Sequence, residues 1–185
     1  MGILLAFAPF LAFAVVERIF SPVEGLIAGT LVSLALIIRD AMTPGRSPKI
    51  LEIGTMILFA GLTLYSFLGR PAWSVIGVRL CVDAGLLLIV LASIALGRPF
   101  TLQYAREQVP PEVQATPAFV RTNYIISGVW ALAFAAMVVA EAALLYVPDL
   151  PRRIGIIVIV LALVGAVKFT SWYPAQVGKT TSQPQ

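Results

Sequence analysis

The sequence predicts an all-α, polytopic integral membrane protein, a bundle of six transmembrane helices. Of its 185 residues, 59% are hydrophobic and 12% are charged, and the mean hydropathy is +0.95, a composition typical of membrane proteins. The long apolar runs lack period-two alternation, and a backbone in lipid must satisfy its own hydrogen bonds, so we expect helices. The predicted spans are Gly2 to Phe20, Val23 to Ile38, Ile50 to Leu68, Trp73 to Leu96, Thr122 to Val147 and Ile154 to Trp172. They are expected to form one domain over residues 1–177, followed by a disordered polar tail over residues 178–185.

Prolines mark the predicted helix starts. Ser21-Pro22 precedes the second span, and Glu24 stands three residues after the serine, as in a capping box. The next four spans follow Ser47-Pro48, Pro71, Thr116-Pro117 and Pro151. Pro9 is different because it lies inside the first span, where the missing N–H is expected to bend the helix.

The first span also matches a secretory signal in one respect. Ala12-Phe13-Ala14 has the small-x-small form of a cleavage site, but no Lys or Arg precedes the apolar run. We therefore favour a membrane span, and cleavage would leave five.

Basic residues predict the orientation, because positively charged loops resist translocation. With six spans both termini share one side, which collects Arg39, Arg46, Lys49, Arg98, Arg106, Arg121, Lys168 and Lys179. The opposite side collects Arg18, Arg70, Arg79, Arg152 and Arg153. This bias predicts both termini in the cytoplasm. It also explains the net charge of +4, and since the basic residues form no continuous run we expect no nucleic-acid binding.

The longest connection, residues 97–121, is predicted to lie on the cytoplasmic side. Gly97 is placed to cap the fourth span, and Pro99 to begin a short interfacial helix. Phe100, Tyr104 and Arg106 would then form an amphipathic turn at the level of the lipid headgroups. The alternative, which we favour, is a solvated loop whose aromatic side chains rest on lipid, because the stretch is too short for a strong amphipathic pattern.

Missing residue types exclude several kinds of site. Without histidine, the chain has no bis-imidazole haem, no His-ligated zinc or copper and no Ser-His-Asp triad. Its one cysteine, Cys81, cannot form an internal disulfide or a thiolate cluster. The acidic residues are scattered along the chain. We therefore predict no catalytic residues, no metal site, no cofactor and no enzymatic activity.

Ionisable residues inside the spans need partners, because a charge near the bilayer centre costs roughly 2.5 to 3.5 kcal/mol on insertion scales. Arg79 and Asp83 lie one turn apart on one helix face, and with Glu141 they form a candidate intramembrane polar cluster in the outer half of the membrane. Glu52 and Lys168 are at similar depth on the inner side and form a second candidate pair.

Each candidate has a functional and a structural interpretation. The outer cluster is either a polar crevice for a proton, an ion or a lipid headgroup, or a salt bridge that fixes helix packing. For Arg79 and Asp83 we favour the salt bridge, and for Glu52 and Lys168 we favour side chains that snorkel to the interface.

Small residues predict a face for helix packing on the second span. Gly25, Gly29 and Ser33 lie on one stripe, so another helix can approach closely. The partner is another span, a second copy of the chain or another membrane protein.

Short segments in the central half of the chain resemble a known family. They are Phe59-Ala60-Gly61-Leu62-Thr63-Leu64, Gly97-Arg98-Pro99-Phe100, Trp130-Ala131-Leu132-Ala133-Phe134 and Leu144-Leu145-Tyr146-Val147. With them the chain resembles the bacterial intracellular septation protein A family of inner-membrane proteins. The family tends to carry asparagine where this chain has Ser127 and Glu141. The resemblance implies a small protein of the bacterial inner membrane that acts through partners in cell-envelope upkeep or division, with no established catalytic residues.

Two functions follow as hypotheses. The first is a non-catalytic scaffold or accessory subunit in cell-envelope maintenance or division, with the lipid bilayer and other membrane proteins or a second copy as partners. The alternative is a small transporter or lipid-handling protein that uses Arg79, Asp83 and Glu141. We favour the scaffold because the two halves of the chain lack a matching pair of broken helices.

Overall fold

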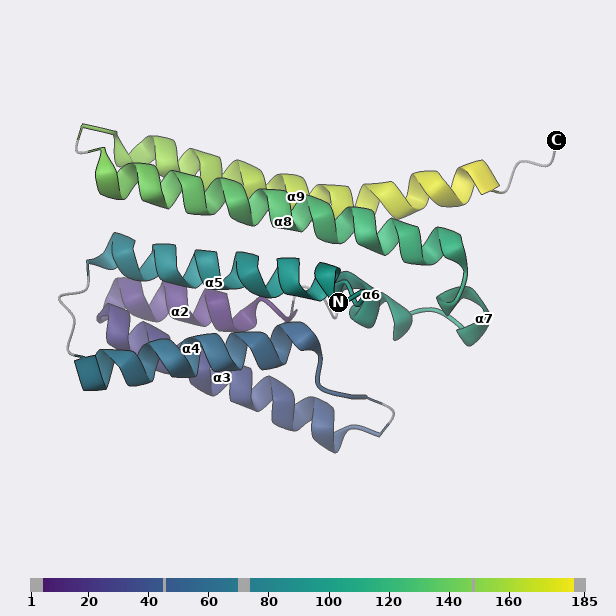
Figure 1. Cartoon of the computed structure of the whole chain (residues 1–185), viewed down its shortest axis with the longest axis horizontal. Coiled ribbons are helices and arrows are strands. Elements are labelled where there is room, and N and C mark those ends of the chain that lie inside the picture. The colour runs from purple at the N-terminus through teal and green to yellow at the C-terminus, as the bar shows by residue number, and fades with distance from the viewer. Residues whose placement is uncertain (1–4, 45, 70–73, 148, 182–185) are drawn as a thin grey trace. The chain divides into compact units, whose positions relative to one another are not determined.

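The structure, a computed structural model, describes residues 5–44, 46–69, 74–147 and 149–181, and of residues 178–181 it describes the backbone alone. Throughout these residues the protein is built from helices (Figure 1). The helices are α2 (Ala8–Ile19), α3 (Pro22–Met42), α4 (Ile50–Gly69), α5 (Val75–Ala95), α6 (Phe100–Arg106), α7 (Pro111–Gln114), α8 (Pro117–Tyr146) and α9 (Arg152–Thr181). This confirms the predicted all-α class for that part of the chain.

Five of the described helices are long and apolar enough to cross a membrane, namely α3, α4, α5, α8 and α9. Each overlaps one of the last five predicted spans. α2 has 12 residues, a length of about 18 Å against a hydrocarbon core of roughly 30 Å. Since residues 1–4 lie outside the described part, the first predicted span, Gly2 to Phe20, stays a prediction, and with it the total of six.

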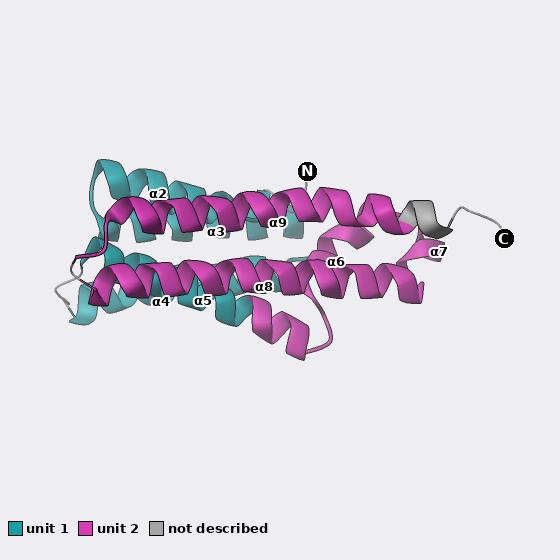
Figure 2. Cartoon of the chain, turned by 90° about the horizontal axis from the view of Figure 1, so that it is seen from above, with its two compact units in different colours: residues 1–89 teal, residues 90–185 magenta. Residues whose placement is uncertain are grey.

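The chain divides into two compact units, Met1–Ile89 and Val90–Gln185, with the boundary inside α5 (Figure 2). Unit 1 holds α2, α3, α4 and most of α5, and unit 2 holds the end of α5 with α6 to α9. The single domain expected over residues 1–177 stays a prediction, because one membrane domain is compatible with two compact units.

The start of the first long helix segment differs from the expectation. Leu5 is helical, Ala6 and Phe7 form a turn, and α2 begins at Ala8. Pro9, which has no N–H to donate to the carbonyl of Leu5, thus marks an interruption of the helix rather than a bend.

At the other end of the chain, α9 continues past the predicted end at Trp172, through Pro174 to Thr181. Residues 178–181 are therefore a last helical turn rather than part of a disordered tail, and residues 182–185 lie outside the described chain.

The proline signals predict the helix starts well. α3 begins at Pro22 and α8 at Pro117, where the missing N–H is not needed for the helix. Thr116 caps α8, because its Oγ1 accepts a hydrogen bond from the N–H of Phe119 at 3.4 Å. Ser21 stands at the corresponding position of α3, but its side chain makes no capping bond, so the predicted capping box is not formed.

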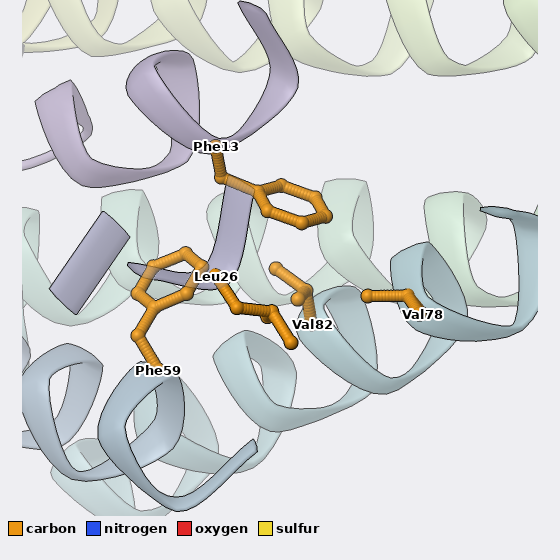
Figure 3. Close-up of a cluster of buried hydrophobic side chains, with 5 residues drawn as sticks. All are labelled: Phe13, Leu26, Phe59, Val78 and Val82. Carbon is orange, nitrogen blue, oxygen red and sulfur yellow. The ribbon is translucent and has the colours of Figure 1, made fainter. Parts of the chain in front are cut away.

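The core of unit 1 joins all four of its helices (Figure 3). Phe13 of α2, Leu26 of α3, Phe59 of α4 and both Val78 and Val82 of α5 point toward one another and are at most 4% exposed. The rings of Phe13 and Phe59 have centroids 5.7 Å apart. These contacts hold helices that are distant in sequence in one bundle.

The small residues of α3 lie in this bundle. Gly25, Gly29 and Ser33 are all on the buried face of the helix. A Cβ on Gly25 would lie 2.8 Å from Cβ of Glu17 on α2, and a Cβ on Gly29 would lie 2.7 Å from the ring of Phe59 on α4. The stripe therefore serves contacts within the chain, with α2 on one side and α4 on the other.

Unit 2 is built on an antiparallel pair, α8 and α9 (Figure 1). The indole N–H of Trp130 on α8 donates to Oγ1 of Thr170 on α9 at 2.9 Å. Gly155 allows α9 to begin close to α8, since a Cβ there would overlap the side chain of Leu144.

The end of α5 is closed by Gly97, which has a φ of +71°. Its N–H bonds the carbonyl of Ile94 at 3.0 Å, and the N–H of Arg98 bonds the carbonyl of Ser93 at 2.9 Å. This is the glycine C-cap that the sequence predicts. The short helix expected after Pro99 is α6.

Candidate functional site

Five charged residues meet where α3 ends and α4 begins. We call them the α3–α4 charged cluster: Arg39, Asp40, Arg46, Lys49 and Glu52. The side chains of Asp40, Lys49 and Glu52 are 0%, 4% and 1% exposed, whereas those of Arg39 and Arg46 are 35% and 44% exposed. The cluster therefore has a buried half and an open half.

Asp40 is the centre of the cluster. Its Oδ1 accepts a hydrogen bond from Nε of Arg39 at 2.8 Å and lies 2.6 Å from the NH2 group of the same guanidinium. Its Oδ2 accepts from Nζ of Lys49. The guanidinium of Arg46 is more distant, with NH1 3.8 Å from Oδ1. Three cations thus surround one fully buried carboxylate.

Glu52 adds a second carboxylate on the other side of Lys49. Its Oε1 lies 3.9 Å from Nζ of Lys49 and 4.0 Å from NH2 of Arg39. Its Oε2 accepts a hydrogen bond from the backbone N–H of Lys49 at 3.3 Å. Lys49 is therefore held between two carboxylates.

Helix ends explain why these residue types stand here. Glu52 lies in the first turn of α4, where it accepts an N–H that has no partner within the helix and where the helix dipole favours an anion. Asp40 lies in the last turn of α3, where the dipole disfavours an anion, so the carboxylate depends on Arg39 and Lys49 for compensation.

A second ion pair lies in unit 1. Nε of Arg79 on α5 donates to both carboxylate oxygens of Glu17 on α2, at 3.0 and 3.1 Å. The Glu17 side chain is 1% exposed and that of Arg79 is 35% exposed. Arg79, which we expected beside Asp83, thus forms an ion pair with Glu17 on another helix, and Asp83 is partly buried one turn further along α5.

The other predicted site residues are divided between the units. Glu141 is buried on α8 in unit 2, at 3% exposure, so its place in a cluster with Arg79 and Asp83 stays a prediction. Lys168 is exposed on α9 in unit 2, while Glu52 belongs to the α3–α4 charged cluster of unit 1. Their expected pair also stays a prediction.

The sequence reasoning missed Glu17 and Asp40. Both stand at the end of an apolar run, Asp40 just beyond the predicted end of the second span at Ile38, where a charge is usually solvated. The signal in the sequence that could have found them is their depth in the predicted membrane. In the predicted six-span topology Glu17 and Arg79 both lie near the outer ends of their spans, and Asp40 and Lys49 both lie just beyond the inner ends of theirs, so each has a partner at a similar depth.

In unit 2, a polar contact fastens α6 to α8. The hydroxyl of Thr101 donates to the carbonyl of Asn123 at 2.9 Å, and it lies 2.8 Å from Oγ of Ser127. A hydroxyl has a single proton, so Ser127 is the donor in this second bond. At the start of α6, the N–H of Phe100 donates to Oγ of Ser93 at 3.2 Å.

The aromatic residues of α6 are part of the protein interior. Phe100 is 0% exposed and Tyr104 is 3% exposed, and the ring of Phe100 meets Trp130 edge-on with centroids 6.5 Å apart. The prediction that these rings lie on lipid at headgroup level is therefore wrong, because contacts with α8 bury them.

No group of three or more His, Cys, Asp and Glu side chains within the described residues is arranged to hold a metal ion. The clusters above are ion pairs and hydrogen bonds between helices, and what they do chemically is hold those helices in register.

The sequence was compared with models of protein families, with curated proteins and with solved structures, and no match was found in any of the three.

Proposed function

We propose that the chain is a multi-pass protein of the bacterial inner membrane, with six transmembrane helices and both termini in the cytoplasm. It acts there as a non-catalytic scaffold or accessory subunit in cell-envelope maintenance or division. The observation that carries this proposal is the distribution of side chains, with charges paired in the interior and large apolar groups outside.

α9 shows this distribution most clearly. Its exposed apolar side chains are Ile154, Ile156, Ile157, Val160, Leu161, Val164, Val167 and Trp172. In water such a surface would drive aggregation, whereas in a bilayer it contacts lipid tails or the helix of a partner. Meanwhile Glu17 and Asp40, which lipid would reject, are buried in ion pairs.

A structural role is supported by where the polar groups are used. Arg79 joins α5 to α2, Lys49 joins the start of α4 to the end of α3, and Thr101 joins α6 to α8. These contacts are explained by helix packing and require no substrate. A protein of this kind works through what its outer surface binds.

Cysteine labelling tests the topology. Cys81 is the single native cysteine, so a Cys81→Ser chain accepts one new cysteine at Gly2, Glu107 or Asp149. We expect an impermeant maleimide to label position 149 in intact cells, and positions 2 and 107 only after permeabilisation. Labelling of position 2 from outside would refute six spans, and labelling of position 107 from outside would refute the orientation.

Complementation tests the role. In a strain that lacks the protein and shows an envelope or division defect, we expect Asp83→Asn and Glu141→Gln to restore growth and cell length whenever the protein assembles. If either variant reaches the membrane in normal amounts and fails to complement, the scaffold is refuted in favour of a transporter. The matched control is Asp149→Asn, because Asp149 is exposed between α8 and α9.

A further inference from the structure

We propose that the open half of the α3–α4 charged cluster binds the phosphate of an anionic phospholipid headgroup through Arg39 and Arg46. The inference rests on the proposed function for the location of the chain in a bacterial inner membrane and for its orientation there.

The α3–α4 charged cluster contains one more cation than it contains anions. Three basic side chains face two carboxylates, so the cluster carries a net formal charge of +1. Lys49 is 4% exposed and held between Asp40 and Glu52, which places its charge inside the protein. The surplus belongs to Arg46, whose ion pair with Asp40 is 3.8 Å long and whose side chain is 44% exposed.

The two arginines are close enough to share one ligand. NH2 of Arg39 and NH1 of Arg46 lie 2.6 and 3.8 Å from the same oxygen of Asp40, so they are no more than about 6.4 Å apart. A phosphodiester has two unesterified oxygens, and charge-assisted contacts of about 2.8 Å to each would span two donors at this separation. Guanidinium groups are the donors that suit phosphate best.

The buried half of the cluster prepares Arg39 for binding. Its Nε and NH2 both contact Oδ1 of Asp40, and Asp40 is itself held by Lys49 in the interior. A guanidinium positioned in advance loses little side-chain freedom when a ligand arrives, so less of the binding free energy is spent on ordering.

The location of the cluster favours a lipid as the source of the phosphate. The cluster joins the end of α3 to the start of α4, and both helices are long enough to cross a membrane. The ends of such helices are at the depth of the headgroups. In the proposed topology this is the cytoplasmic side, where anionic lipids attract basic residues.

Thermal unfolding of the full-length protein in a neutral detergent tests the inference. Wild type is titrated with phosphatidylglycerol, with phosphatidylcholine and with inorganic phosphate, and Tm is followed. We expect phosphatidylglycerol to raise Tm at concentrations where the other two do not. Arg46→Gln should weaken the response to phosphatidylglycerol about tenfold, the effect of losing one hydrogen bond between charged groups.

The matched control is Arg106→Gln. Arg106 is exposed at the end of α6, on the proposed cytoplasmic side and outside the cluster, so its variant has the same net charge as Arg46→Gln. An equal loss in both variants would show general attraction to anionic surfaces and overturn the site. An equal rise in Tm with inorganic phosphate would overturn the lipid as ligand.

A second measurement does not depend on a variant that folds. Native mass spectrometry of wild type with equal amounts of phosphatidylglycerol and phosphatidylcholine should show preferential retention of the anionic lipid, and equal retention would overturn the inference. The proposed function would stand in that case. It fails separately if the cysteine labels report another topology.

Discussion

Arg79 of α5 and Glu17 of α2 form an ion pair in which one guanidinium N–H donates to both carboxylate oxygens, at 3.0 and 3.1 Å, across 62 positions of the sequence. The carboxylate is almost wholly buried and the guanidinium is partly exposed. The pair connects α2, at the start of unit 1, to α5, at its end, so its loss should destabilise the whole bundle of unit 1.

Glu17→Gln should therefore destabilise the protein. Loss of one partner from a buried pair typically costs about 3–5 kcal/mol, and we expect roughly 2 kcal/mol here because the remaining guanidinium is 35% exposed and reaches solvent. Thermal unfolding in detergent measures the effect. Arg18→Gln is the control, because Arg18 is the exposed neighbour of Glu17 on α2. A double-mutant cycle with Arg79→Gln that shows no coupling would contradict the pair.

Asp40→Asn should lower the free energy of unfolding more than Glu17→Gln does, by about 3–5 kcal/mol, since it leaves Lys49 buried at 4% exposure beside a neutral amide. The same substitution at exposed Asp149 should change the free energy of unfolding little. If the two variants unfold at the same temperature, the α3–α4 charged cluster does not stabilise the turn between these helices.

Gly29→Ala should weaken the contact between α3 and α4. The new methyl would lie 2.7 Å from the ring of Phe59, which is 0% exposed and cannot move without disturbing the core, so we expect a loss of about 1–3 kcal/mol. Gly61→Ala on α4 is the matched control, because nothing lies within 4 Å of its Cβ position. There alanine should be neutral or stabilise the helix by roughly 0.5–1 kcal/mol. Equal effects at both positions would argue against the close approach.

Ser127→Ala should loosen α6. The substitution removes the hydroxyl that donates to Thr101 at 2.8 Å, which should lower the free energy of unfolding by about 1 kcal/mol. Hydrogen exchange over residues 100–106 should therefore become faster. Ser171→Ala is the same substitution on α9, where the hydroxyl is exposed and bonds only its own helix. Unchanged exchange in Ser127→Ala would show that the buried rings, rather than this bond, hold α6.

Particular elements show how far local sequence reasoning reached. Gly97 and Pro117 were located correctly as the end of one helix and the start of another, because a left-handed φ and a missing N–H act on the nearest turn of backbone. The rings of Phe100 and Tyr104 were placed wrongly on lipid. The ring of Phe100 is buried against Trp130 of α8, a helix that follows much later in the chain.

The sequence by itself determined that this protein is helical and where most of its helices begin and end, because hydropathy, proline and glycine act within a few residues. Only the tertiary structure decided which polar groups meet: Glu17 with Arg79, Asp40 with Lys49, and Thr101 with Ser127. The physical reason is that a charge or hydroxyl buried away from water must find a partner, while its own position in the chain does not say on which helix that partner lies.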